Sequence, residues 1–140
     1  MKNSLIIGNL VCGLVVVAPA MAGQHLDGRY AYYQAASTAQ ADRGPRNDAD
    51  CRQFIASDLY DSDGGEHLTI KGNRWDDGQD VSAVTGKVTM RSAQAGVTPF
   101  TINLESEGDS GPTKGTLKHI GTLGIAITIS GRTLHYCKVQ

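Results

Sequence analysis

The stretch "GIAITISGRTLHYCKV", residues 124–139, contains two strand-like runs joined by a turn. Its first part, residues 124–130, is rich in β-branched side chains, which favour strands. Ser130-Gly131 predicts a tight hairpin turn into the second run, residues 132–139. The stretch therefore predicts a pair of hydrogen-bonded antiparallel strands, and the rest of the chain repeats the same kind of pattern.

Further strand patterns precede this pair. Residues 100–106, "FTINLES", alternate apolar and polar side chains, as expected for a sheet with one face in water. The other predicted strands are short and are separated by turns that contain Gly or Asp; they cover residues 28–37, 66–75, 81–90 and 114–120. The sequence thus predicts a mainly β protein with about seven to eight strands.

Helical patterns are scarce. Residues 38–50 are polar and include a Gly-Pro breaker, so a loop is predicted there. Residues 48–60 place apolar side chains at helical spacing, and Asp48 or Asp50 would cap the start of a helix. A short helix is therefore favoured over a strand in this segment.

Closely spaced strands with short connections favour an antiparallel meander. Closing the meander into a barrel removes its exposed edges, so the predicted fold is an up-and-down β-barrel. A β-sandwich is the alternative arrangement. No repeat of 20 to 50 residues is present, and residues 23–140 are predicted to form a single domain.

The two ends of the predicted barrel domain resemble calycins, the superfamily of lipocalins, fatty-acid-binding proteins and avidins. Gly28-Arg29-Tyr30 stands where these barrels carry Gly-x-Trp, and Arg132 lies in the last strand, from which a calycin Arg packs across that aromatic residue. Tyr replaces Trp, and the middle of the chain has no second lipocalin motif. The resemblance implies a barrel architecture, and a disulfide from the C-terminal region back to the barrel.

Residues 1–22 have the pattern of a secretory signal peptide. Lys2 precedes an apolar run, and a small-x-small pattern ends at Ala22, where cleavage is expected. Lipidation at Cys12 is not expected, because Val11 occupies a position that favours a small residue. No second apolar stretch follows, so we predict no membrane span and a periplasmic or secreted location.

Two cysteines, Cys51 and Cys137, follow the predicted cleavage site. An even number of cysteines in an exported protein indicates a disulfide, with two free thiols as the alternative. The mature chain carries 12 basic and 14 acidic residues, so its net charge is close to −2. This balance gives no electrostatic reason to expect binding to nucleic acid or to an anionic membrane.

The stretch "EGDSGP", residues 107–112, resembles the sequence around the nucleophile of chymotrypsin-like serine proteases. A nucleophilic Ser110 would need a histidine base, an orienting carboxylate and a second barrel, which the sequence does not indicate. The same residues all favour turns. We therefore predict no catalytic residues and interpret the stretch as an exposed loop on which Glu107, Asp109 and Ser110 contact a partner.

No metal or cofactor is predicted. The acidic clusters at residues 61–66 and 76–80 lack the ligand spacing of a calcium loop. The histidines have no zinc-site spacing, although His119 and His135 would meet if their strands were neighbours.

Two aromatic residues are further contact candidates. Trp75, the single tryptophan, would line a barrel rim or fill one end of the core. Tyr33 alternates with Tyr30 and Tyr32 and so faces the other side of the first strand.

Small size, export and the lack of a catalytic set favour a noncatalytic binding protein that blocks a protein partner, as a hydrolase inhibitor or an immunity protein does. The alternatives are a carrier of a small apolar ligand and a small hydrolase.

Overall fold

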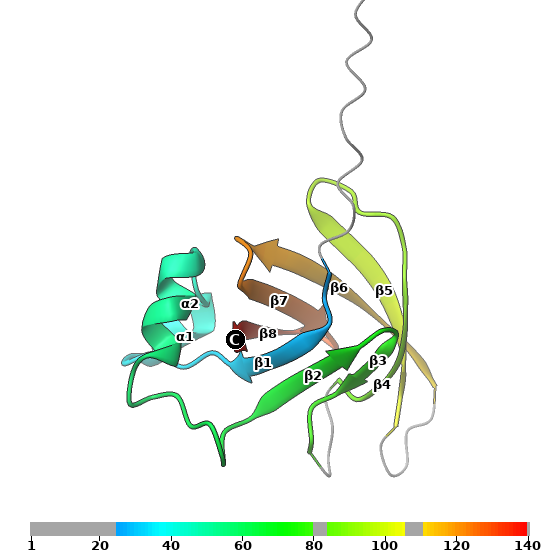
Figure 1. Cartoon of the computed structure of the whole chain (residues 1–140). Coiled ribbons are helices and arrows are strands. Elements are labelled where there is room, and N and C mark those ends of the chain that lie inside the picture. The colour runs from blue at the N-terminus through cyan, green and yellow to red at the C-terminus, as the bar shows by residue number, and fades with distance from the viewer. Residues whose placement is uncertain (1–24, 80–83, 106–110, 140) are drawn as a thin grey trace, which may run out of the picture.

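A computed structural model describes residues 25–79, 84–105 and 111–139. Within these residues, antiparallel strands close into a single barrel in which every strand pairs with its neighbours in the chain (Figure 1). The strands are β1 (Gly28–Tyr32), β2 (His67–Lys71), β3 (Arg74–Asp76), β4 (Gly86–Met90), β5 (Val97–Leu104), β6 (Pro112–Ile120), β7 (Gly124–Ile129) and β8 (Arg132–Val139). The predicted up-and-down barrel is confirmed, and the alternative sandwich is not.

Strand β1 closes the barrel because it pairs on both sides. Tyr30 lies opposite Leu68 of β2 on one side and opposite Lys138 of β8 on the other. The predicted strand at residues 66–75 is in fact two strands, because the chain turns at Gly72, whose φ is 60°. The C-terminal hairpin is confirmed: Ser130 and Gly131 both have positive φ, as a two-residue hairpin turn requires.

One cluster of buried side chains fills the barrel. Alternate residues of each strand point inward, and Trp75 packs against Phe100 with ring centroids 5.0 Å apart. The other buried members of this cluster come from the remaining strands and the segment before β4; they are Tyr30, Leu68, Ile70, Val84, Val88, Ile102, Leu117, Ile125, Ile127, Ile129, Leu134 and Tyr136. The barrel interior is therefore a packed core.

Two short helices follow β1 and lie outside the barrel wall (Figure 1). The second, α2 (Asp48–Ile55), packs on the outer face of β1 and β8. Cys51 of α2 forms the predicted disulfide with Cys137 of β8, and Phe54 of α2 covers Tyr33. These contacts form a second apolar cluster that fixes the helix to the barrel.

The prediction of a loop over residues 38–50 is wrong, because residues 38–43 form helix α1 (Thr38–Arg43). The Ser37 side chain accepts a hydrogen bond from the Gln40 amide and caps the helix start, and Gly44 ends it with a φ of 75°. Helix α1 buries none of its residues, so it has no apolar periodicity for sequence reasoning to detect.

The helix predicted within residues 48–60 is confirmed as α2, but its cap differs from the prediction. The N-cap is Asn47, whose side chain accepts from the Asp50 amide, instead of Asp48 or Asp50. The Asp48 carboxylate is used elsewhere: it accepts hydrogen bonds from the amides of Thr122 and Leu123 in the β6–β7 turn, at 2.7 and 2.8 Å.

The calycin-like expectation that Arg132 packs across Tyr30 is also wrong. The cation over the Tyr30 ring is the Nζ of Lys138, 5.7 Å from the ring centroid. The register explains the difference, because β8 places Lys138 opposite Tyr30 and leaves Arg132 at the other end of the strand.

Several expectations lie outside the described residues: the signal peptide over residues 1–22 with Cys12, the start of the strand predicted at residues 81–90, and the contact residues Glu107, Asp109 and Ser110. Among the residues that the structure does describe, no helix is both long and apolar enough to cross a membrane.

Candidate functional site

Trp75 and Tyr33, two of the predicted contact residues, are buried. Trp75 is 1% exposed inside the barrel. Tyr33 points outward as predicted, but α2 covers it, and the ring meets Phe54 edge-on at a centroid distance of 5.4 Å. Neither ring presents a broad face to a partner in this structure.

As far as the structure describes them, the acidic and histidine clusters do not come together as ligand sets. Asp61 Oδ1 accepts hydrogen bonds from the Asp63 and Gly64 amides, both at 2.9 Å, so this carboxylate closes its own turn. Strand β7 separates His119 of β6 from His135 of β8, and the two histidines occupy different rows of the sheet. In the described ranges, no three His, Cys, Asp or Glu side chains are grouped to hold a metal ion.

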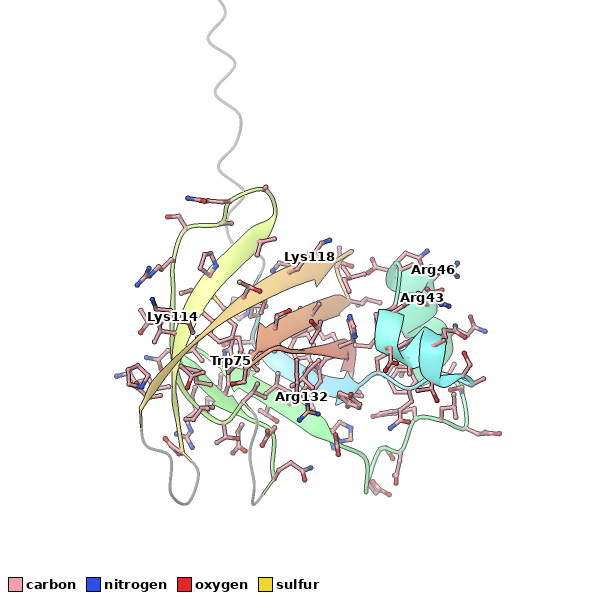
Figure 2. All side chains as sticks on the ribbon, turned by 180° about the vertical axis from the view of Figure 1, so that it is seen from behind. Arg43, Arg46, Trp75, Lys114, Lys118 and Arg132 are labelled. Atoms are coloured by element: carbon pink, nitrogen blue, oxygen red, sulfur yellow. A yellow bond between two sulfur atoms is a disulfide. The ribbon has the colours of Figure 1, made fainter. Side chains whose placement is uncertain are left out.

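A groove of about 730 Å³ runs along the outer face of β6, β7 and β8, beside the segment that links α1 to α2. We call it the outer groove. Its lining includes cations, threonines and small apolar residues: Arg43, Pro45, Arg46, Val97, Thr116, Lys118, His119, Ile120, Gly121, Ala126, Thr128, Thr133 and His135. Figure 2 shows Lys118 on the sheet and Arg43 and Arg46 on the helical segment.

The floor of the outer groove is set by strand register. Thr116, Thr128 and Thr133 lie side by side in one row across β6, β7 and β8. The next outward-facing row holds Lys118, Ala126 and His135, while the row between them points into the core. Because side chains alternate between the two faces of each strand, the three adjacent strands present a row of hydroxyls next to a row that contains the Lys118 cation.

The wall of the groove is held rigidly. The backbone of Gly44 lies directly on the His135 ring, and Pro45 beside it is buried. Asp48 then fastens the start of α2 to the β6–β7 turn, with a third hydrogen bond from Thr122 Oγ1 at 2.7 Å. The disulfide at Cys51 fixes the next turn of the helix.

The lining of the outer groove is basic, and the carboxylates of Asp42, Asp48 and Asp50 flank it beside His135, Gly121 and Arg46. None of its lining residues is acidic. Arg46 pairs with Asp50 at 2.9 Å, but neither Arg43 nor Lys118 forms an ion pair with any residue in the described part of the chain. Lys114 lies on the same outward face of β6 as Lys118, further along the strand from the helical segment (Figure 2).

The two histidines add no charge at neutral pH. Burial lowers the pKa of His135 below its usual range, although the nearby Asp42 carboxylate opposes this shift. Burial also lowers the pKa of His119. The positive character of the groove at pH 7 therefore comes from its arginines and lysine.

The chain matches no protein-family model, no curated protein and no solved structure. Guanidinium and ammonium groups beside hydroxyl donors bind carboxylates, phosphates and sulfates, so the arrangement suits an anionic group. Within the described residues, no hydroxyl or thiol is hydrogen-bonded to a histidine, as an activated nucleophile would be.

Sequence reasoning missed this site, although a signal was present. Residues 111–140 contain four basic residues and no Asp or Glu. Residues 23–110 contain 8 basic residues and all 14 acidic ones, a net charge of −6. The net charge of the whole chain conceals this division. It appears when the net charges of the two parts of the chain are compared.

Proposed function

We propose that this protein is an exported, noncatalytic binding protein that blocks a protein partner, in the manner of a hydrolase inhibitor or an immunity protein. Its contact surface in this proposal is the outer groove. The observation that carries the proposal is the placement of Arg43 and Lys118, without acidic partners among the described residues, on two sides of a groove that has no acidic lining residue.

The barrel favours binding through its outer surface over two other modes of binding. These are addition of a partner strand to a sheet edge and carriage of a ligand in the interior. A closed barrel has no free strand edge to which a partner peptide could add as a further strand. The interior is occupied by the packed core, which supports surface binding in preference to carriage of an apolar ligand. A partner is thus expected to bind through side chains on the outer wall.

Rigidity of the groove supports the same proposal. Its helical wall is fixed by the hydrogen bonds of Asp48, by the disulfide and by the contact of Gly44 with His135. A surface that is already ordered loses little conformational entropy on binding, so more of the contact energy appears as affinity.

Affinity capture from periplasmic and culture extracts tests the proposal. The mature wild-type chain is compared with an Arg43→Glu/Lys118→Glu double variant and with Lys71→Glu, a matched control. Lys71 is an exposed residue of β2, which is not among the strands that line the groove. The wild type and Lys71→Glu are expected to retain the same protein, which the double variant loses.

The captured protein is then purified and its own activity is titrated with the wild type. We expect stoichiometric loss of that activity, with no effect of the double variant. Equal retention by all three chains, or an activity unaffected by saturating wild type, contradicts the proposed function.

A further inference from the structure

We infer that the outer groove receives a short acidic peptide segment, in which at least two carboxylates meet cations from the sheet and from the helical wall. This inference rests on the proposed function, because it names the part of the partner that enters the groove. Arg43 stands on the helical wall and Lys118 on the floor, so carboxylates on an extended segment can reach both (Figure 2).

The hydroxyls on the groove floor are suited to donate hydrogen bonds to these carboxylates. Thr128 and Thr133 hydroxyls are 2.9 Å apart, and one donates to the other. Each hydroxyl has a single proton to donate, so the accepting hydroxyl still has its own O–H to offer to a carboxylate. Thr116, in the same row, adds a third hydroxyl.

The small apolar lining residues favour a peptide as the carrier of these carboxylates. Val97, Ala126 and Pro45 also line the outer groove, and Val97 and Ala126 lie in the same row as Lys118. They provide surface for the methylene groups and the backbone of a peptide. None of the lining residues is Phe, Tyr or Trp, whereas binding of single-stranded nucleic acid relies on stacking of bases on aromatic rings.

The charge division of the chain limits the length of the anion. Residues 23–110 carry a net charge of −6, while the groove residues on β6 and β8 belong to the acid-free part of the chain. Asp42, Asp48 and Asp50 flank the groove beside His135, Gly121 and Arg46, so a long polyanion that extends beyond the groove would approach these carboxylates and be repelled. A short acidic segment can pair with the cations of the groove without this electrostatic repulsion.

Direct binding measurements with defined probes test the inference. A short capped peptide of alternating Asp and Glu is titrated into the mature wild-type chain by calorimetry at low salt. Its isosteric Asn/Gln counterpart is the control. We expect the acidic peptide to bind, the amide peptide to bind at least roughly tenfold more weakly, a difference of about 1.4 kcal/mol, and added salt to weaken the acidic complex.

Charge variants test whether the acidic peptide binds in the outer groove. Lys118→Glu and Arg43→Glu are each expected to raise the Kd of the acidic peptide at least roughly tenfold. Lys118→Arg, which keeps the charge, and Lys71→Glu, on β2, are expected to leave it within about twofold. Thermal unfolding of each variant checks that the fold is retained.

Three results overturn the inference: equal binding of the acidic and amide peptides, an unchanged Kd in both charge-reversal variants, or tighter binding of an oligothymidylate or a sulfated oligosaccharide than of the acidic peptide. These failures are distinct from failure of the proposed function. A partner that the wild type captures and the Arg43→Glu/Lys118→Glu variant loses, together with equal binding of the acidic and amide peptides, removes the acidic-segment inference alone. If the acidic peptide binds but no partner is captured, the proposed blocking function is contradicted, whereas the peptide-binding site stands.

Discussion

Gly44 lies so close to His135 that the imidazole ring occupies the space where a β-carbon at position 44 would stand. The contact joins the end of α1 to β8, and Gly44 has a φ of 75° and a ψ of −178°, a conformation essentially confined to glycine. Both the backbone conformation and the lack of room for a β-carbon therefore require glycine at the point where the wall of the outer groove meets its floor.

Gly44→Ala is expected to destabilise the protein by more than the roughly 1–3 kcal/mol that such a sparsely populated backbone conformation alone costs a non-glycine residue. Gly72→Ala is the matched control, because Gly72 also has positive φ but no atom lies near its missing β-carbon. Urea unfolding monitored by Trp75 fluorescence measures both variants. A Gly44→Ala/His135→Ala double variant should lose less stability than the sum of the single variants, and strict additivity would show that the ring contact is unimportant.

Asp48→Asn is expected to remove part of the acid sensitivity of the fold. Hydrogen bonds from Thr122 and Leu123 hold the pKa of Asp48 below its usual value in the folded protein. A carboxyl with a depressed folded pKa contributes stability above its unfolded pKa of about 3.9, and this contribution is lost as the pH falls through the folded pKa.

The free energy of unfolding of wild type and Asp48→Asn should therefore differ most above about pH 5, by about 1 kcal/mol after allowance for solvent screening, and should converge towards pH 2. Urea titrations at a series of pH values give the difference curve directly. Other carboxyls with lowered pKa, such as Asp50 and Asp61, affect both proteins equally. A difference that does not change with pH would contradict the assigned role.

Removal of the disulfide by Cys51→Ala/Cys137→Ala is expected to lower the free energy of unfolding by roughly 4–5 kcal/mol on the chain-entropy model. The cysteines are 86 positions apart, so the bond closes a long loop in the unfolded chain. Addition of a dithiol reductant to the wild type should reproduce most of the loss and should leave the double variant unchanged. Wild-type stability that is insensitive to full reduction would exclude this contribution.

Gly115→Ala is expected to destabilise the core by about 1–3 kcal/mol through overpacking. Gly115 lies opposite Phe100 across the β5–β6 pair, and a β-carbon there would overlap the Phe100 ring and lie 2.8 Å from the Thr128 carbonyl oxygen. Gly111→Ala is the control, since Gly111 faces open space without a positive φ. If Gly115→Ala unfolds at the same urea concentration as Gly111→Ala, the core tolerates the added methyl group.

Strand alternation made most of the barrel predictable. Phe100, Ile102 and Leu104 alternate with polar residues as a half-buried strand requires, and the structure places the first two in the core and packs Leu104 against it. Helix α1 was not predictable in this way, because its stability comes from local caps at Ser37 and Gly44 and it buries no apolar stripe.

The outer groove was harder to predict than the fold. Lys118 and Thr116 alternate with buried residues in an ordinary strand pattern, and nothing in that pattern identifies which strands lie beside them. Arg43 lies in a segment predicted to be a loop and reaches the sheet only because Asp48 and Cys51 draw the helices onto it. The site depends on tertiary contacts, whereas the sequence pattern indicated aromatic residues and a turn-like loop as contact residues.

The two sides of the outer groove come from parts of the chain that meet only in the finished fold, since Asp48 and Thr122, which join them, are 74 positions apart. A chain in which β6 to β8 have not yet closed on β1 has no groove, so recognition and complete folding are thermodynamically linked. A ligand of the groove binds the native state alone and must raise the melting temperature as its concentration increases. Partner binding would in that way select for molecules that have completed folding and oxidation.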